Sequence, residues 1–156
     1  MTNRAWTLTP TQNLNFSGGV IHVINHVLTL PQNVTATARS SNLTSFTGAL
    51  AAANLNVTVD QMRDVTIFAP RNAAFQSIGS ALQNLSTQAL SSILTYHVVP
   101  GRVGYSTGLM NNTQLQTAAG PNITIRIENG TVFANGARVV TPDVLVSNGV
   151  IHIIDK

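Results

Sequence analysis

The adjacent residues Tyr96 and His97 are the pair whose side chains are most suited to chemistry. A histidine can ligate a metal or transfer a proton near neutral pH, but catalysis also needs companions. The chain contains no glycine-rich phosphate loop, no His-Glu-x-x-His and no Gly-x-Ser-x-Gly motif. We therefore interpret His97 as a structural hydrogen-bonding residue or, with Tyr96, a partner-binding residue, and we predict no catalytic residue and no enzyme activity. The carboxylates, which show no paired spacing, are Asp60, Asp64, Glu128, Asp143 and Asp155.

The histidines also give no metal-binding spacing. His22 and His26 are four residues apart in a run that reads as a strand, where that spacing places them roughly 13 Å apart. The chain has no cysteine, so disulfides and thiolate metal sites are excluded. We predict no metal and no cofactor.

The composition is apolar and poor in charge. Apolar residues make up 44% of the 156 residues and charged residues 8%, which allows one domain with a substantial core. The net charge is +3, but the seven arginines are scattered instead of forming the basic patch of a nucleic-acid binder, so we predict no nucleic-acid partner. No apolar run is long enough to span a bilayer directly.

Acceptor sequences for N-glycosylation, Asn-x-Ser/Thr, are unusually frequent. They occupy eight of the 16 asparagines, whereas the Ser and Thr content predicts about three by chance. This excess indicates a secreted glycoprotein with glycans on its surface. The candidate sites are Asn15, Asn33, Asn42, Asn56, Asn84, Asn111, Asn122 and Asn129.

A segment near the start repeats at the end of the chain. Ser-Gly-Gly-Val-Ile-His-Val-Ile-Asn at 17–25 matches Ser-Asn-Gly-Val-Ile-His-Ile-Ile-Asp at 147–155, an offset of 130 residues. Two copies of one strand, one domain length apart, indicate a tandem array. We expect residues 1–30 to be the C-terminal strand region of a preceding unit and residues 31–156 to be one unit nearly whole.

The first half of this unit reads as mostly helical. We expect one helix over Thr37–Asn54, where Leu43, Phe46, Leu50 and Ala53 form a single apolar stripe. Val57 to Asp60 reads as a turn or short strand, and Val65 to Ala69 as a buried strand. Asn72 and Ser86 are each expected to cap a following helix through the side chain.

The second half reads as strands. Tyr96 to Val99 is expected to return the chain to strand, and from Thr113 apolar residues alternate with polar ones. Asn129-Gly130 and Asn135-Gly136 are strong hairpin signals, because both residues of each pair tolerate a positive φ. Helices first and strands last predict an α+β domain with an antiparallel or mixed sheet.

Three segments resemble the sequence boxes of the fasciclin (FAS1) family. They are Thr-Ile-Phe-Ala-Pro-Arg-Asn-Ala-Ala-Phe at 66–75, Tyr-His-Val-Val at 96–99, and Asn-Gly-Val-Ile-His-Ile-Ile-Asp at 148–155. Their order and spacing fit the family across residues 36–156. One departure is Arg71, which stands where the family usually has Thr or Ser.

The resemblance implies a FAS1-type, wedge-shaped β-sandwich with a helical layer. It also implies a secreted, cell-surface or cell-wall protein, often held by a GPI anchor elsewhere in the chain, that binds cell-surface or matrix proteins or polysaccharides in adhesion. The family's Tyr-His motif is tied to adhesion, which would make Tyr96 and His97 partner-binding residues. Two alternatives stay open: an accessory role in extracellular, laccase-linked oxidation, and a purely structural spacer.

The apolar strand expected at 19–28 would lack the sheet of its own unit. An unpaired strand seeks another edge, so this segment could dock on the domain, fray or pair with a second chain. We predict that it promotes homodimers.

Overall fold

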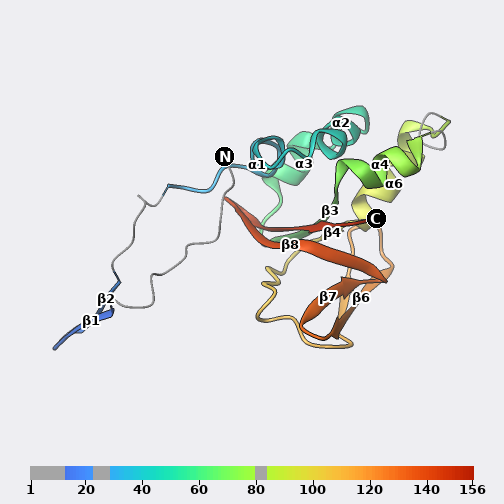
Figure 1. Ribbon diagram of the computed structural model, residues 1–156. Coiled ribbons are helices and arrows are strands. Elements are labelled where there is room, and N and C mark those ends of the chain that lie inside the picture. Colours follow the sequence, from blue (N-terminus) through green and yellow to red (C-terminus); the bar gives the residue numbers. More distant parts are fainter. Residues whose placement is uncertain (1–12, 23–28, 80–83) are drawn as a thin grey trace.

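The computed structural model describes residues 13–22, 29–79 and 84–156. Five helices lie in the described part of the chain and form a layer at one end of the molecule (Figure 1). Their bounds are Val34–Ser40 (α1), Thr44–Ala52 (α2), Asn56–Gln61 (α3), Asn72–Ser77 (α4) and Thr87–Tyr96 (α6).

The main sheet has seven strands in the order β4-β3-β9-β8-β7-β6-β5. The β3–β9 pair is parallel and the other pairs are antiparallel, so the sheet is mixed, as the sequence allowed. The strand bounds are Val65–Pro70 (β3), Val98–Val99 (β4), Gln114–Gln116 (β5), Asn122–Glu128 (β6), Thr131–Ala134 (β7), Ala137–Val146 (β8) and Gly149–Ile154 (β9).

The long strand β8 serves two separate cores. Its pairing with β9 shifts register between Val139 and Val144, and such irregularities bend a strand. Val144 packs with the helices and β3, whereas Val139 packs with β6 and β7. The sheet therefore turns from the helical layer to enclose a second core, which gives the expected α+β wedge (Figure 1).

The stretch expected to be one helix is two. The apolar stripe is correctly predicted, since Leu43, Phe46 and Leu50 are buried. However, α1 ends at Ser40 and α2 starts at Thr44, because Asn42 between them has a φ of 60°. Such a left-handed residue ends a helix, and asparagine tolerates this conformation better than most residues.

Helix α3 occupies the segment expected to be a turn or short strand. The β-branched residues of this segment favoured a strand in the sequence interpretation. In the structure, Val59 is buried in the helical core while Val57 is 64% exposed. One anchor of this kind per turn is the pattern of a helix. Tertiary packing therefore outweighs local strand propensity here.

Both predicted hairpins are confirmed. Asn129 and Gly130 join β6 to β7 with φ values of 48° and 76°. Asn135 and Gly136 join β7 to β8 with φ values of 47° and 83°. Two successive positive φ values are those of a type I′ turn, whose twist suits an antiparallel pair.

A separate hairpin precedes the domain. Strands β1 (Asn13–Phe16) and β2 (Gly19–His22) pair antiparallel and form a sheet of their own. The start of the strand expected over 19–28 is thus present, and residues 23–28 lie outside the described part of the chain.

Candidate functional site

The Tyr-His pair lies where α6 ends. The hydroxyl of Ser86 accepts a hydrogen bond from Ala89 N at 3.2 Å, which confirms its predicted capping role. Contrary to expectation, Tyr96 is the last residue of the helix and His97 is its C-cap, with His97 N donating to Leu94 O. Of the four residues expected to be strand, only Val98 and Val99 are strand. Tyr96 and His97 instead complete the last turn of α6, despite the strand propensity of tyrosine.

Tyr96 connects the helix to the strands below it. Its half-buried side chain accepts a hydrogen bond from Asn135 Nδ2, and its hydroxyl lies 3.5 Å from Asn122 O. Asn135 is the first residue of the β7–β8 turn, and its own Oδ1 accepts from Thr124 N at 2.8 Å. The phenol therefore holds α6 against strand β6 and the β7–β8 turn.

His97 is held by its own helix. Its Nδ1 lies 2.8 Å from Ile93 O, so this nitrogen carries the proton and donates it. Burial lowers the pKa of His97 more than this hydrogen bond raises it, which favours the neutral ring. The remaining nitrogen, Nε2, is then an acceptor. The two rings meet edge to face, with centroids 6.1 Å apart.

A second histidine, His152 of β9, lies at the centre of a buried network that the sequence interpretation missed. Its Nε2 donates to Gly104 O at 2.7 Å, and its Nδ1 accepts from Asp143 N at 3.3 Å. The ring also stacks on Phe68, with centroids 5.4 Å apart. Burial lowers the pKa of His152, opposed by the Gly104 hydrogen bond and by the charge of Asp143.

The network extends to both sides of that ring. Thr66 of β3 accepts from Gly104 N at 2.8 Å and donates to Arg102 O at 2.7 Å. The Asp143 carboxylate accepts from both Ser106 N and the Ser106 hydroxyl. The loop after β4 is thereby joined to the first and last sequence boxes. The repeat of a histidine within an apolar strand was the one signal of this role.

The predicted cap at Asn72 is wrong. Arg71 is the N-cap of α4 and makes no side-chain capping bond, because a guanidinium has no acceptor atom. Asn72 instead accepts from Ser45 N at 3.0 Å and donates to Asn42 O at 2.8 Å. Its amide thus joins α4 to the start of α2.

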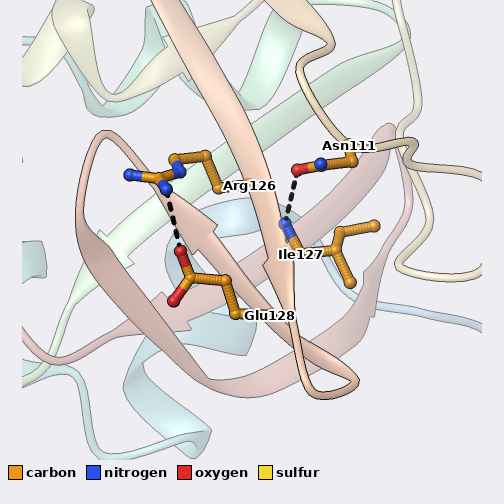
Figure 2. Close-up of polar contacts among 4 residues, drawn as sticks. All are labelled: Asn111, Arg126, Ile127 and Glu128. Carbon is orange, nitrogen blue, oxygen red and sulfur yellow. Dashed lines mark hydrogen bonds and ion pairs between the residues drawn. The ribbon is translucent and has the colours of Figure 1, made fainter.

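The glycosylation candidates are mostly exposed. Side chains of Asn33, Asn42, Asn84, Asn111, Asn122 and Asn129 reach the surface, and Asn56 is half-buried. Asn15 lies in β1. Figure 2 shows the contact in which Asn111 Oδ1 accepts from Ile127 N, which measures 3.0 Å. The exposed ion pair Arg126–Glu128, with a separation of 3.0 Å, lies on the other side of that strand in the same view.

The described residues contain no cluster of three or more His, Asp or Glu side chains that could hold a metal ion. No described helix is both long and apolar enough to cross a bilayer. The Tyr-His site offers one phenol and one neutral imidazole, and each of them already makes a hydrogen bond within the domain. This arrangement can accept a hydrogen bond and offer aromatic surface.

Residues 41–156 match the family model of the Fasciclin domain. The chain belongs to the fasciclin domain family. Its fold matches a FAS1 domain pair from the insect cell adhesion molecule fasciclin I, with a TM-score of 0.69 and 23% identity over 92% of this chain and 56% of that one. The fasciclin fold expected from the three sequence boxes is thus confirmed.

Relatives of the fasciclin domain occur in fungi and bacteria. A fasciclin-like arabinogalactan protein of Arthroderma benhamiae is 45% identical over 141 residues, which is 90% of this chain and 33% of that protein. The cell surface glycolipoprotein MPB83 of Mycobacterium bovis is 36% identical over 136 residues, 81% of this chain and 60% of that protein. The chain thus spans less than two thirds of either relative.

Proposed function

We propose that this fasciclin domain is an extracellular adhesion or matrix-binding module that binds partner proteins or cell-wall polysaccharide and catalyses no reaction. The observation that carries the proposal is the family match over residues 41–156. The likeness in fold to a cell adhesion molecule and in sequence to a cell surface glycolipoprotein supports it. The exposed sequons support a secreted, glycosylated protein at a cell surface or in a cell wall, with a GPI anchor as one means of attachment.

The folded unit is proposed to span residues 31–156, with residues 1–30 derived from a preceding fasciclin unit. Helix α1 supports the first boundary, because Val34 is 0% exposed and packs in the core, upstream of the family match. The sequence of β2, Gly-Val-Ile-His, supports the origin of residues 1–30 in a preceding unit, because the same four residues begin β9. The homodimer through residues 19–28 follows from this proposal. Sedimentation with and without residues 1–30 tests it, and identical values would contradict it.

The proposed partner contact is the Tyr-His patch, which we define as Ile93, Tyr96 and His97. Ile93 is 42% exposed and lies one helical turn before His97, so the two share a face of α6. The patch offers apolar surface, an aromatic ring and the acceptor Nε2 of a neutral histidine. A partner that places a donor opposite this nitrogen would be recognised.

The experiment measures retention of the full chain on cells and on isolated cell-wall polysaccharide. Ile93→Ser alters only the exposed side chain of the patch, and Ile78→Ser is its matched control, since Ile78 is 48% exposed after α4. Tyr96→Ala/His97→Ala removes the patch more fully and is scored only where circular dichroism shows a folded protein. We expect at least a fivefold loss of retention for the two patch variants and none for Ile78→Ser.

The outcomes distinguish the Tyr-His patch as the contact, adhesion through another surface, and the two alternative functions. Equal retention of all folded variants would contradict the Tyr-His patch as the contact while leaving the adhesion module in place. Retention of no variant, wild type included, would contradict adhesion and favour the spacer or the accessory role in oxidation.

A further inference from the structure

A hollow of about 550 Å³ lies next to the start of β3, and no residue of the Tyr-His patch lines it. It is open to solvent. Three loops enclose it: the α3–β3 turn with Arg63 and Asp64, the loop after β4 with Tyr105, and the β8–β9 turn with Asn148. Pro31, just before α1, closes one side.

Three side chains that line this hollow have no partner among the residues that the structure describes. The guanidinium of Arg63, the carboxylate of Asp64 and the hydroxyl of Tyr105 make no hydrogen bond or ion pair with any residue that the structure describes. Arg63 and Asp64 are adjacent and exposed without pairing to each other. Tyr105 is 44% exposed, unlike the half-buried Tyr96. These groups are free to contact a ligand.

The loops that carry these side chains are held in place by hydrogen bonds. Val65 N donates to Asn148 O at 3.0 Å, which joins the α3–β3 turn to the β8–β9 turn. Ser147 N donates to Gln32 O at 2.8 Å, and Asn148 Nδ2 donates to Met62 O at 2.8 Å. The loop after β4 is held by the hydrogen bond from Gly104 N to the Thr66 hydroxyl, and Gly104 is next to Tyr105 in the chain. The hollow is therefore preformed, which lowers the entropic cost of binding.

The chemistry of the three side chains suits an uncharged, hydroxyl-rich chain. A tyrosine ring offers an apolar face with a polar edge, a carboxylate accepts from two hydroxyls, and a guanidinium donates in a fixed fork. The adjacent opposite charges of Arg63 and Asp64 cancel, so the site has no preference for a charged ligand. A hollow of this volume lies within the range of ligand sites, with room for about two or three sugar rings.

We propose that this hollow binds a short stretch of a neutral polysaccharide, with a sugar ring on Tyr105 and its hydroxyls bonded to Arg63 and Asp64. The proposal rests on the adhesion function above and assigns it a carbohydrate subsite separate from the Tyr-His patch. Because the hollow is open to solvent, a longer chain can extend beyond it.

Binding is measured by calorimetry with the full chain and neutral hexasaccharides of glucose, mannose, galactose and N-acetylglucosamine, with a uronate hexasaccharide for comparison. For at least one neutral sugar we expect Tyr105→Ala and Arg63→Ala each to weaken Kd by tenfold or more. Tyr105→Phe, which keeps the ring, should stay within threefold. Arg39→Ala, an exposed arginine at the end of α1, should stay within twofold. Should Tyr105→Ala not fold, the Arg63 and Arg39 variants decide the result.

The failure of this site can be told from the failure of the adhesion function. Wild-type retention on polysaccharide with unchanged Kd in both hollow variants would overturn the hollow and leave adhesion standing. Binding of the uronate alone would overturn its neutral specificity. Retention on cells with no affinity for any sugar would overturn the hollow and leave a protein partner for the Tyr-His patch.

Discussion

His152 Nε2 lies 2.7 Å from the carbonyl oxygen of Gly104, and its other ring nitrogen faces the backbone N–H of Asp143. A carbonyl on one side and an N–H on the other permit only the neutral ring with its proton on Nε2. A proton added to Nδ1 would meet the Asp143 N–H and break that contact. The hydrogen bonds that join the loop after β4 to the first and last sequence boxes should therefore weaken in acid.

The free energy of unfolding should fall as the pH drops below about 6.5, the pKa of an unfolded histidine. Burial lowers the pKa of both His97 and His152, so the unfolded chain binds protons that the folded chain does not. Their contribution is complete above pH 6.5 and is lost at up to about 1.4 kcal/mol per pH unit for each histidine. Urea unfolding between pH 5 and 7.5 measures this slope. His97→Gln should make the slope shallower while the contribution of His152 remains, and a flat wild-type profile would contradict the neutral assignments.

Gly149→Ala should destabilise the domain by about 3 kcal/mol or more, near the upper end for single substitutions. A Cβ built on Gly149 would lie 1.9 Å from Val65 O, and the paired strand β3 cannot move away without breaking the sheet. Gly48→Ala in α2 is the matched control, because that Cβ meets nothing within 4 Å. Its helix propensity predicts a gain of up to about 1 kcal/mol. Thermal unfolding of both variants measures the difference, and equal melting temperatures would refute it.

Asp143→Ala should lower the free energy of unfolding by about 1–3 kcal/mol, because the N–H and hydroxyl of Ser106 lose their acceptor. Asp143 also has a φ of 58°, which alanine tolerates less well. Glu128→Gln removes a carboxylate from an exposed ion pair and should cost under about 1 kcal/mol. Chemical denaturation compares the two, and a loss at Asp143 no larger than at Glu128 would argue against a structural role.

Glycan occupancy should be lowest at Asn56 among the described sequons. Its side chain is half-buried in α3, and its Oδ1 is enclosed without a hydrogen-bond partner in the part of the chain described. Asn122 lies exposed in β6 and should carry more glycan. Expression in a glycosylating host followed by peptide mass spectrometry gives both occupancies. Higher occupancy at Asn56 than at Asn122 would show that α3 is modified before it folds.

Sequence reasoning worked where one short signal determines the backbone. The pairs Asn129-Gly130 and Asn135-Gly136 predicted two turns because few other residues adopt two positive φ values in succession. It was less successful where packing decides. The valines of α3 favour a strand in isolation, and Asn42 carries no local sign that it will divide a helix.

The candidate site was predicted in part. Tyr96 and His97 were recognised as a pair, but the partner of the Tyr96 hydroxyl is 39 residues away in another turn. Three loops distant in sequence form the hollow around Tyr105, and no local pattern marks such a meeting. Contacts of this kind depend on the register of the sheet, which a single sequence does not give.

The parallel pairing of β3 with β9 has a mechanical consequence. Gln32, before α1, is hydrogen-bonded to Ser147 in the turn that leads into β9, whereas Ile154 lies at the other end of that strand (Figure 1). Tension between these two points pulls β9 lengthwise between β3 and β8. The hydrogen bonds on both sides are then loaded in shear and must break together instead of one at a time. We therefore expect the domain to resist a pull along the line of the chain.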